Sequence, residues 1–205
     1  MYLITGRQLL PQATTSQDLS FLIDFANRAA AAGVDMVQIR ERDLPARDLF
    51  SLTEAIAKSA TATPVLVNDR ADVAACTEAG VHLTTRSLTA DVVRSSFGHQ
   101  MLVGVSTHTL EEAEAAERDG ADFVVFGPVF DTASKKEYGD PLGVAALRRV
   151  ADCLRIPTLA LGGIKLSNYQ EALDAGAAGV AGISMFTEAE DLNKLVSTIK
   201  NRGVA

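Results

Sequence analysis

Short apolar runs alternate with amphipathic stretches along the whole chain, and several of the junctions repeat one phrase. The phrase is the end of a helical pattern, a glycine and then a run rich in β-branched residues, as in "AAAAGVDMVQIR" from Ala29 and "ERDGADFVVFG" from Glu117. It returns in "TEAGVHLTT" from Thr77 and "LDAGAAGVAGIS" from Leu173. The glycine suits the left-handed residue that ends a helix, and the run suits a strand buried on both faces. The repeat therefore predicts parallel strands joined by helices.

Eight such apolar runs can be counted in the 205 residues. They lie at residues 2–5, 35–39, 64–68, 80–83, 102–106, 122–127, 157–161 and 179–184. Helical periodicity fills most of the gaps; in "TLEEAEAAERDG" two alanines share a face, and Thr109 with Glu112 predicts a capping box. We therefore expect one (β/α)8 TIM barrel over residues 1–205. A doubly wound open sheet is the alternative, but no GxGxxG fingerprint follows the first run.

Composition narrows the class of protein. With 47% hydrophobic and 22% charged residues, the chain is typical of a soluble globular protein, and its apolar runs are too short to span a bilayer. The start, "MYLITGRQLL", lacks the basic residues and long apolar centre of a signal peptide. A net charge of −7 argues against general nucleic-acid binding but allows a local basic pocket. We expect a cytoplasmic protein that binds neither nucleic acid nor membranes.

The two cysteines suggest no chemistry. Cys76 and Cys153 are far apart and form no CxxC motif, so zinc or redox sites have little support. We expect both thiols to be reduced and partly buried.

The candidate chemistry gathers where the predicted strands end, which is where barrels of this kind build their active sites. Gln38 and Arg40 are two residues apart, so both can face the barrel mouth, and Arg42 continues the line. The third run ends in "NDR" with Asn68 and Asp69.

The next runs add hydroxyl groups, imidazoles and a lysine. The fourth carries His82, and the fifth ends at Ser106 with His108 just beyond it. The sixth leaves the interior through "VFGPVFDTASKK", which presents Thr132, Ser134 and Lys135.

Phosphate is the ligand that these residues share. Guanidinium groups bind phosphate oxygens in pairs, and a lysine is a compact cation for the same purpose. The pair Gly162 and Gly163 lets backbone N–H groups approach an anion, as does the turn at Ile183 and Ser184, and these loops are the usual phosphate site of such barrels. Asp69, beside so much positive charge, is a candidate Mg²⁺ ligand.

Simpler structural explanations exist for single residues. The two glycines are compatible with an ordinary tight turn, and Asp69 with Arg70 is compatible with a surface ion pair at a helix start. His82, inside an apolar run, is expected to be a hydrogen-bonded core residue rather than a catalyst. Three further cations, Arg86, Lys136 and Lys165, are expected to be solvated charges.

From "YLIT" to the last helix the chain resembles the thiamine phosphate synthase and thiazole tautomerase superfamily. The match rests on "VQIRER", "VLVNDRADVA", "GVHL", "GVSTHTLEEA", "DFVVFGPVFDTASKK", "LALGGI" and "GVAGIS", in the order of the family. In the synthase branch a pyrimidine pyrophosphate ionises and a thiazole phosphate nitrogen attacks the carbocation.

The resemblance implies a role for each matching residue. Gln38 and Arg40 would contact the pyrimidine and the pyrophosphate beside Asn68, and Asp69 would bind Mg²⁺. The pyrophosphate or thiazole substrate would be held by Ser106, Thr132, Ser134 and Lys135. The thiazole phosphate would be bound by Gly162, Gly163, Ile183 and Ser184.

Three departures from the family pattern leave the branch open. Arg42 stands where the synthase usually has lysine, and Ser87 stands where an aspartate completes its Mg²⁺ site, which should weaken metal binding. Pro128, in the synthase spelling "FGPVF", replaces the tautomerase histidine, and proline cannot transfer a proton.

Three hypotheses therefore stand. We favour a thiamine phosphate synthase with an altered Mg²⁺ site; a thiazole phosphate tautomerase, in which His108 would have to act as acid or base, and a non-catalytic thiazole phosphate-binding protein are the alternatives. A homodimer is possible, and the polar segment 130–143 is predicted to close over the site.

Overall fold

The secondary structure of the computed structural model follows the predicted order. It describes residues 1–9, 19–132 and 140–201. The strands are β1 Tyr2–Ile4, β2 Met36–Ile39, β3 Val65–Asn68, β4 Gly80–Thr84, β5 Val103–Thr107, β6 Phe123–Phe126, β7 Thr158–Ala160 and β8 Gly179–Gly182. The helices are η1 Arg7–Leu9, α1 Ser20–Ala32, α2 Ala46–Ser59, α3 Ala71–Cys76, α4 Ala90–Phe97, α5 Leu110–Arg118, α6 Gly143–Cys153, α7 Tyr169–Asp174, α8 Ser184–Thr187 and α9 Leu192–Lys200.

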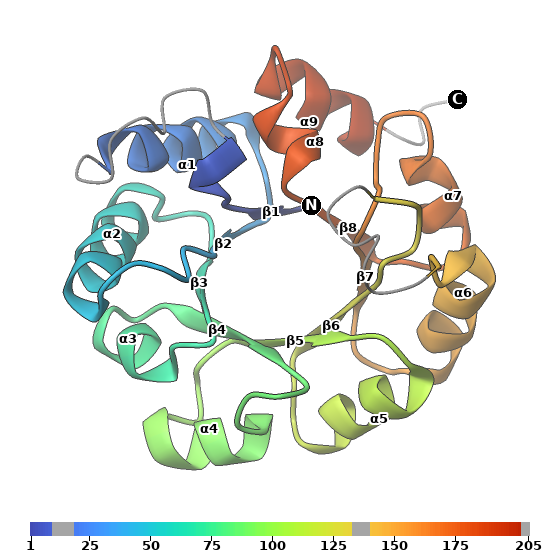
Figure 1. Ribbon diagram of the computed structural model, residues 1–205, viewed down its shortest axis with the longest axis horizontal. Helices are drawn as coiled ribbons and strands as arrows, with labels where there is room; N and C mark the ends of the chain where they lie inside the picture. The colour runs from blue at the N-terminus through green and yellow to red at the C-terminus, as the bar shows by residue number, and fades with distance from the viewer. Residues whose placement is uncertain (10–18, 133–139, 202–205) are drawn as a thin grey trace.

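The strands form a closed parallel barrel in sequence order. Each strand pairs with the next, and β1 pairs with β8 to close the ring. Figure 1 looks along the barrel, with the strands in the centre and the helices around them. The predicted (β/α)8 architecture is confirmed, and the open sheet is excluded because no strand edge remains unpaired.

The glycines of the repeated phrase end helices at most of the junctions. Gly33 has a φ of 98° and donates its N–H to the Ala29 and Ala30 carbonyls, and Gly120 has a φ of 89°. The junction before β4 differs, because Glu78 takes the left-handed conformation there, with a φ of 56°. Gly80 instead lies in the strand, where an added Cβ would come within 2.6 Å of the Leu102 carbonyl oxygen. At this junction the prediction that glycine ends the helix is wrong.

Buried side chains form two separate clusters that follow the alternation of the strands. The larger cluster joins the outward faces of the strands to the helices, as Val37 and Ile39 of β2 do. The smaller one fills the inside of the barrel with Tyr2, Ile4, Leu66, Phe123, Val125, Leu159 and Ala181. Gly104 makes room for this filling, since a Cβ there would lie 2.3 Å from the ring of Phe123.

The start of α5 shows the predicted capping box in altered form. The Thr109 hydroxyl accepts the Glu112 N–H at 3.2 Å, as expected. The Glu112 carboxylate accepts the N–H of His108 at 2.6 Å, one residue before the cap. The return bond therefore fixes the backbone of the β5–α5 loop beside the strand end.

Two predictions about the surface are tested by the structure. Cys76 and Cys153 are free, but both are exposed, so the prediction of partial burial is wrong. Each is the last residue of its helix, and the residue that follows it, Thr77 or Leu154, is buried in its place. Among the described residues, no helix is both long and apolar enough to cross a membrane.

Candidate active site at the carboxyl ends of the strands

Polar side chains line the barrel interior over four neighbouring strands. The register pairs Asn68 of β3 with His82 of β4, and Thr84 of β4 with Ser106 of β5. Gln38 of β2 is buried, and its amide donates to Asn68 Oδ1 at 3.2 Å. Because every second residue of a strand faces the same way, these side chains share the inside of the barrel near its carboxyl end.

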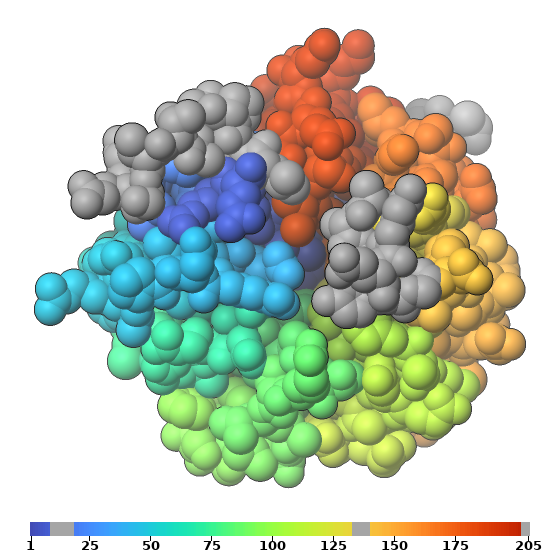
Figure 2. Space-filling view, in the orientation of Figure 1, coloured from blue at the N-terminus to red at the C-terminus, as the bar shows by residue number. Residues whose placement is uncertain are grey.

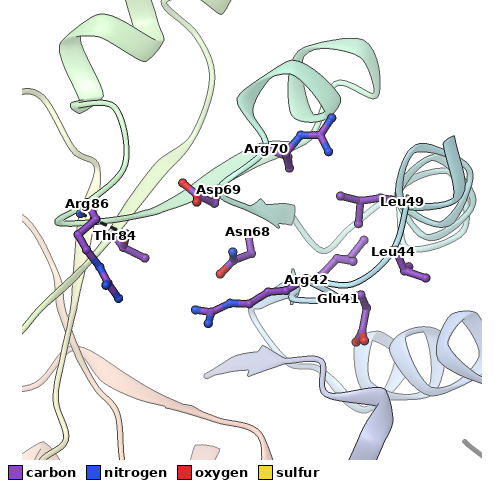
Figure 3. A pocket seen from close by; sticks show the side chains of 10 residues that line it. Glu41, Arg42, Leu44, Leu49, Asn68, Asp69, Arg70, Thr84 and Arg86 are labelled. Atoms are coloured by element: carbon purple, nitrogen blue, oxygen red, sulfur yellow. Dashed lines mark hydrogen bonds between the residues drawn. The ribbon is translucent and has the colours of Figure 1, made fainter. Parts of the chain in front are cut away.

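A cavity of about 400 Å³ opens beside them. It is lined by Ile39, Glu41, Arg42, Leu44, Leu49, Asn68, Asp69, Arg70, Thr84 and Arg86. Figure 3 shows the guanidinium ends of Arg42 and Arg86 extending toward one space, with Asn68 beside it, while Arg70 and Glu41 point away. In the space-filling view of Figure 2 this face of the molecule is hollowed toward its centre.

The arginines of this region fall into two groups. Arg70 binds Asp72 through two nitrogens at 2.8 and 2.6 Å, so it carries little net charge to offer. Arg40, Arg42 and Arg86 form no ion pair with any carboxylate among the described residues. Three guanidinium groups without a protein carboxylate form a preorganised site for a polyanion. Arg86 is exposed, as predicted for a solvated charge, and it also lines the cavity.

Arg40 is the guanidinium held deepest in this group. Burial, and then the charge of Arg42, lower its pKa from the ordinary value, while Glu41 acts in the opposite direction. The backbone N–H of Arg40 donates to Thr5 Oγ1 at 3.0 Å, which fixes the main chain at the end of β2. A bound anion would relieve the cost of holding this half-buried cation next to a second one.

The carboxylate next to Arg40 is committed elsewhere. Glu41 accepts the Thr5 hydroxyl at 2.6 Å and the Arg7 N–H at 3.2 Å. Burial raises the pKa of Glu41, and these two donors oppose that shift. Glu41 therefore holds the β1 and β2 loops together and does not neutralise the arginines of the mouth.

Asp69 is the carboxylate that ends β3 at the cavity. Its φ of 62° is rare for a residue other than glycine, and its N–H donates to the His82 carbonyl at 2.9 Å. Backbone strain of this kind is typical of functional sites. Since Arg70 pairs with Asp72, the alternative of an Asp69–Arg70 ion pair is not found.

The donors near Asp69 fit Mg²⁺ only in part. No cluster of three or more His, Cys, Asp or Glu side chains suited to a metal occurs in the described part of the chain. Ser87 is used in its own turn, where its hydroxyl accepts the Thr84 N–H at 2.8 Å and contacts the Thr84 hydroxyl at 3.0 Å. A single carboxylate can hold Mg²⁺ when substrate phosphates and water complete the shell.

His82 is buried and hydrogen-bonded at both ring nitrogens. Its Nδ1 lies 3.1 Å from the Tyr2 hydroxyl, and its Nε2 lies 2.7 Å from Ser106 Oγ. Burial, and then the charge of Arg40, lower its pKa to about 3. The prediction of a satisfied core histidine is confirmed. Tyr2 was missed from the sequence, although it alternates with Leu3 and so faces the inside of the barrel.

His108 lies apart from these residues. Its Nδ1 contacts the Gly127 carbonyl, and it lines a second cavity of about 370 Å³ between α5 and α6. That cavity is lined by His108, Thr109, Leu110, Glu111, Phe126, Leu142, Ala146, Arg149 and Val150. The structure therefore does not bring His108 into the cavity with Asp69.

The predicted glycine turn after β7 packs against the chain that follows β6. Gly162 and Gly163 have φ values of 95° and 64°, and an added Cβ would lie 2.6 Å from Pro128 Cα or 2.4 Å from the Asp131 carbonyl oxygen. The turn is thus required by close packing. Among the described residues, neither amide N–H donates a hydrogen bond. Ile183 and Ser184 form the start of α8.

The β6 loop is held closed at its base. The Val129 N–H donates to Leu161 O at 2.8 Å and the Phe130 N–H to Gly162 O at 3.0 Å. The carbonyls of Pro128 and Val129 accept the N–H groups of residues 142 and 143 at 2.8 and 3.1 Å. We call these four hydrogen bonds the neck of the loop. Thr132 follows it, while Ser134 and Lys135 lie outside the described residues.

Comparison with known proteins identifies the relatives of this chain. The family model described as thiamine monophosphate synthase matches residues 1–186. The chain belongs to this family. Among curated members, a thiamine-phosphate synthase from Halalkalibacterium halodurans is 35% identical over 212 residues, covering 100% of this chain and 97% of the relative. Another, from Roseiflexus castenholzii, is 38% identical over 194 residues, covering 93% and 82%.

Solved structures agree with the family assignment. A thiamine phosphate pyrophosphorylase from Pyrococcus furiosus superposes with a TM-score of 0.82 and 29% identity, covering 98% of this chain and 93% of that one. A 3-hexulose-6-phosphate synthase, with a TM-score of 0.70 and 15% identity over 98% of both chains, shares the fold. The barrel is therefore shared widely, and the family is defined by sequence.

Proposed function

We propose that this member of the thiamine monophosphate synthase family is a thiamine phosphate synthase, a transferase that acts on small phosphorylated substrates. It joins hydroxymethylpyrimidine pyrophosphate to thiazole phosphate and releases pyrophosphate. The observation that carries the proposal is the group formed by Arg40, Arg42 and Arg86, which have no carboxylate partner among the described residues. Arg42 and Arg86 line the cavity together with Asp69, and the charge of Arg42 acts on Arg40. Relatives named thiamine-phosphate synthase, at 32% to 44% identity, support it.

The reaction places its growing charge where these cations stand. The carbon–oxygen bond to the pyrophosphate breaks, its electron pair leaves with the pyrophosphate, and the thiazole nitrogen then bonds to the methylene carbon. Arg40 and Arg42 would stabilise the departing anion, because preplaced cations need no reorganisation as charge develops. The Gln38–Asn68 amide pair offers donors and acceptors to the pyrimidine ring.

The second substrate would lie toward the later strands. Thr132, Ser134 and Lys135 of the β6 loop would contact the pyrophosphate or the thiazole, and Ser106 would face them from β5. The backbone N–H groups of Gly162, Gly163, Ile183 and Ser184 would bind the thiazole phosphate. At the turn after β7, the amide groups of Gly162 and Gly163 have no acceptor within the described ranges, which supports this assignment.

Mg²⁺ would be held by Asp69, with substrate oxygens and water as its other ligands. When bound, it would supply further positive charge to the pyrophosphate. With Ser87 committed to Thr84, we expect weaker Mg²⁺ binding than a site with two carboxylates provides.

The alternatives have less support. A tautomerase needs a proton-transferring group at position 128, where this chain has proline, and His108 lines a different cavity from Asp69. A binder without activity is compatible with the same arginines and is separated only by assay. A cytoplasmic location and a homodimer stay predictions.

One assay tests the proposal against both alternatives. The protein is incubated with hydroxymethylpyrimidine pyrophosphate, Mg²⁺ and either thiazole phosphate or its carboxylate, and products are followed by mass spectrometry and NMR. Enzyme-dependent thiamine phosphate supports the synthase. Interconversion of thiazole tautomers without coupling would replace it with the isomerase, and binding without turnover would leave a binding protein.

A matched pair of variants assigns the activity to this site. Asp69→Asn should lower the rate and raise the Mg²⁺ concentration needed for half-maximal rate. Asp24→Asn removes an exposed carboxylate that pairs with Arg28 on α1, and it should leave both quantities unchanged. Equal behaviour of the two variants would remove Asp69 from the site.

A further inference from the structure

A hydrogen-bonded row of three side chains crosses the barrel from β1 to β5. The Tyr2 hydroxyl lies 3.1 Å from His82 Nδ1, and His82 Nε2 lies 2.7 Å from Ser106 Oγ. Tyr2 is 0% exposed and His82 is 2% exposed, while Ser106 is only partly buried at the mouth. Tyr2 and His82 are thus buried in the core, and Ser106 lies at the proposed substrate site.

The surroundings of His82 favour a neutral imidazole. Its ring centroid lies 5.6 Å from that of Tyr2 and 6.2 Å from that of Phe123. Among the described residues, no carboxylate contacts it, and the nearby charge is the cation Arg40. A neutral imidazole has one donor and one acceptor nitrogen, so the row has only two possible proton arrangements.

Only one of the two arrangements satisfies every buried donor. If Ser106 donates to Nε2, then Nδ1–H must donate to the Tyr2 oxygen, and the Tyr2 proton is left without an acceptor among the described residues. If Tyr2 donates to Nδ1, then Nε2–H donates to Ser106 Oγ, and both buried groups are satisfied. Buried donors without acceptors are rare because they are costly, so the second arrangement is favoured.

This arrangement determines what Ser106 can do. Its oxygen already accepts the proton of His82 Nε2, and no protein acceptor for its own hydroxyl proton is found in the part of the chain that the structure describes. We propose that Tyr2 and His82 are positioning residues that make Ser106 a hydrogen-bond donor to the bound substrate. The inference rests on the proposed function and specifies that the substrate atom facing Ser106 is an acceptor, a ring nitrogen or a phosphate oxygen.

The packing around the row fixes its orientation. Phe123 meets the Tyr2 ring edge-on at 5.6 Å and 87°, and Phe123 occupies space that exists because residue 104 is glycine. Phe123 therefore restricts the rotation of the Tyr2 and His82 rings. The direction of the hydrogen bonds is therefore built into the barrel before any substrate arrives.

The first test reads the tautomer directly. The chain has three histidines, so ¹⁵N-histidine labelling gives three ring spectra, assigned with the variants His99→Gln and His108→Gln. In the unsubstituted protein, His82 should be a single Nε2–H tautomer. In Tyr2→Phe, which keeps the ring and removes the hydroxyl, the tautomer should become mixed or reversed. An Nδ1–H tautomer or a doubly protonated ring in the unsubstituted protein would overturn the proposal.

The second test is a double-mutant cycle on thiamine phosphate formation. We expect kcat/KM to fall about a hundredfold in Ser106→Ala, as for other lost donors in active sites, and about tenfold in Tyr2→Phe. Tyr2→Phe should cost nothing further in the Ser106→Ala background, because its effect acts through Ser106. Additive losses in the double variant, or an unchanged kcat/KM in Tyr2→Phe, would refute the positioning role of Tyr2 and His82.

Controls separate positioning from damage to the fold. Tyr169→Phe removes a hydroxyl that donates to the Thr198 carbonyl at 3.4 Å on the outside, and it should change neither tautomer nor kcat/KM. If Tyr2→Phe does not fold, the spectrum of the unsubstituted protein still decides. If that protein makes no thiamine phosphate, the proposed function fails while the tautomer result stands by itself.

Discussion

The two sides of the barrel interior are built on different principles. On the side of β2 to β5, the inward positions carry Gln38, Asn68, His82, Thr84 and Ser106. Gln38 bonds to Asn68, His82 bonds to Ser106, and Thr84 bonds to Ser87 in its own turn. On the side of β6 to β8, they carry Phe123, Val125, Leu159 and Ala181, which pack as an apolar cluster. We call these the polar side and the apolar side. The polar side presents hydrogen-bonding groups to a ligand, and the apolar side determines the shape of the barrel interior.

The difference shows why both sides are needed. A buried polar group needs a partner, and Gln38, His82 and Ser106 find theirs on other strands of the barrel. That requirement ties the positions of the groups to the barrel register. On the apolar side the constraint is steric: the ring of Phe123 requires glycine at position 104 of the paired strand β5, and a methyl group on Gly163, in the turn after β7, would collide with residues 130 and 131.

The largest effect should follow from removing the central cation of the polar side. Arg40→Met keeps the apolar stem and deletes the guanidinium, and it should lower kcat/KM by about 10²- to 10³-fold, or about 3–4 kcal/mol of transition-state stabilisation. Arg28→Met, which removes an exposed arginine paired with Asp24 on α1, is the control. Steady-state kinetics with equal losses in both variants would contradict the special role of Arg40.

A substitution on the apolar side should act on stability. Gly163→Ala places a Cβ 2.4 Å from the Asp131 carbonyl oxygen at a φ of 64°. We expect the free energy of unfolding to fall by about 2–3 kcal/mol, measured by urea denaturation. Gly143→Ala has a φ of 77° and no atom within 4 Å of the added Cβ, so it isolates the backbone part of the effect. An unchanged unfolding midpoint in Gly163→Ala would show that the turn is not tightly packed.

The polar side should make stability depend on pH through His82. Its pKa is lowered to about 3, so the unfolded chain takes up a proton below about pH 6.5 that the folded chain does not. Stability should therefore be lost as pH falls from 6.5 toward 3, by up to about 1.4 kcal/mol per pH unit from this group. Urea unfolding at several pH values should show a shallower slope for His82→Gln. Parallel slopes would contradict the buried neutral ring.

The smallest effect is expected outside both sides. Thr109→Ala removes the N-cap of α5, whose hydroxyl accepts the Glu112 N–H at 3.2 Å. The free energy of unfolding should fall by about 1 kcal/mol, and kcat/KM should not change. A large loss of activity in this variant would mean that the helices shape the site as strongly as the barrel interior does.

The sequence predicts the barrel well because its strands are buried on both faces. Each apolar run must lie in the interior, and the repeated junctions leave few arrangements for eight parallel strands. The prediction fails at Gly80, where the pattern cannot distinguish a glycine that ends a helix from one needed between two strands.

The site is predicted less completely, because it depends on the register between strands and on the direction in which each side chain points. Sequence alternation puts Tyr2 inside the barrel, but only the register between strands brings it to His82, 80 residues away. Arg86 looks like any surface charge until the turn that Ser87 closes against Thr84 aims it at the cavity. His108 lies two residues beyond Ser106, directly after β5, yet its ring bonds to the Gly127 carbonyl and lines the cavity between α5 and α6.

The neck of the β6 loop has a consequence for how the protein can change over evolutionary time. Four backbone hydrogen bonds join the two ends of the loop to each other and to the turn after β7, so the two ends are held together at the neck itself. Doubling the length of such a closed segment adds only about 0.6 kcal/mol of entropic cost. If the β6 loop contacts substrate as proposed, we expect insertions and deletions above the neck to change substrate preference at little cost in stability.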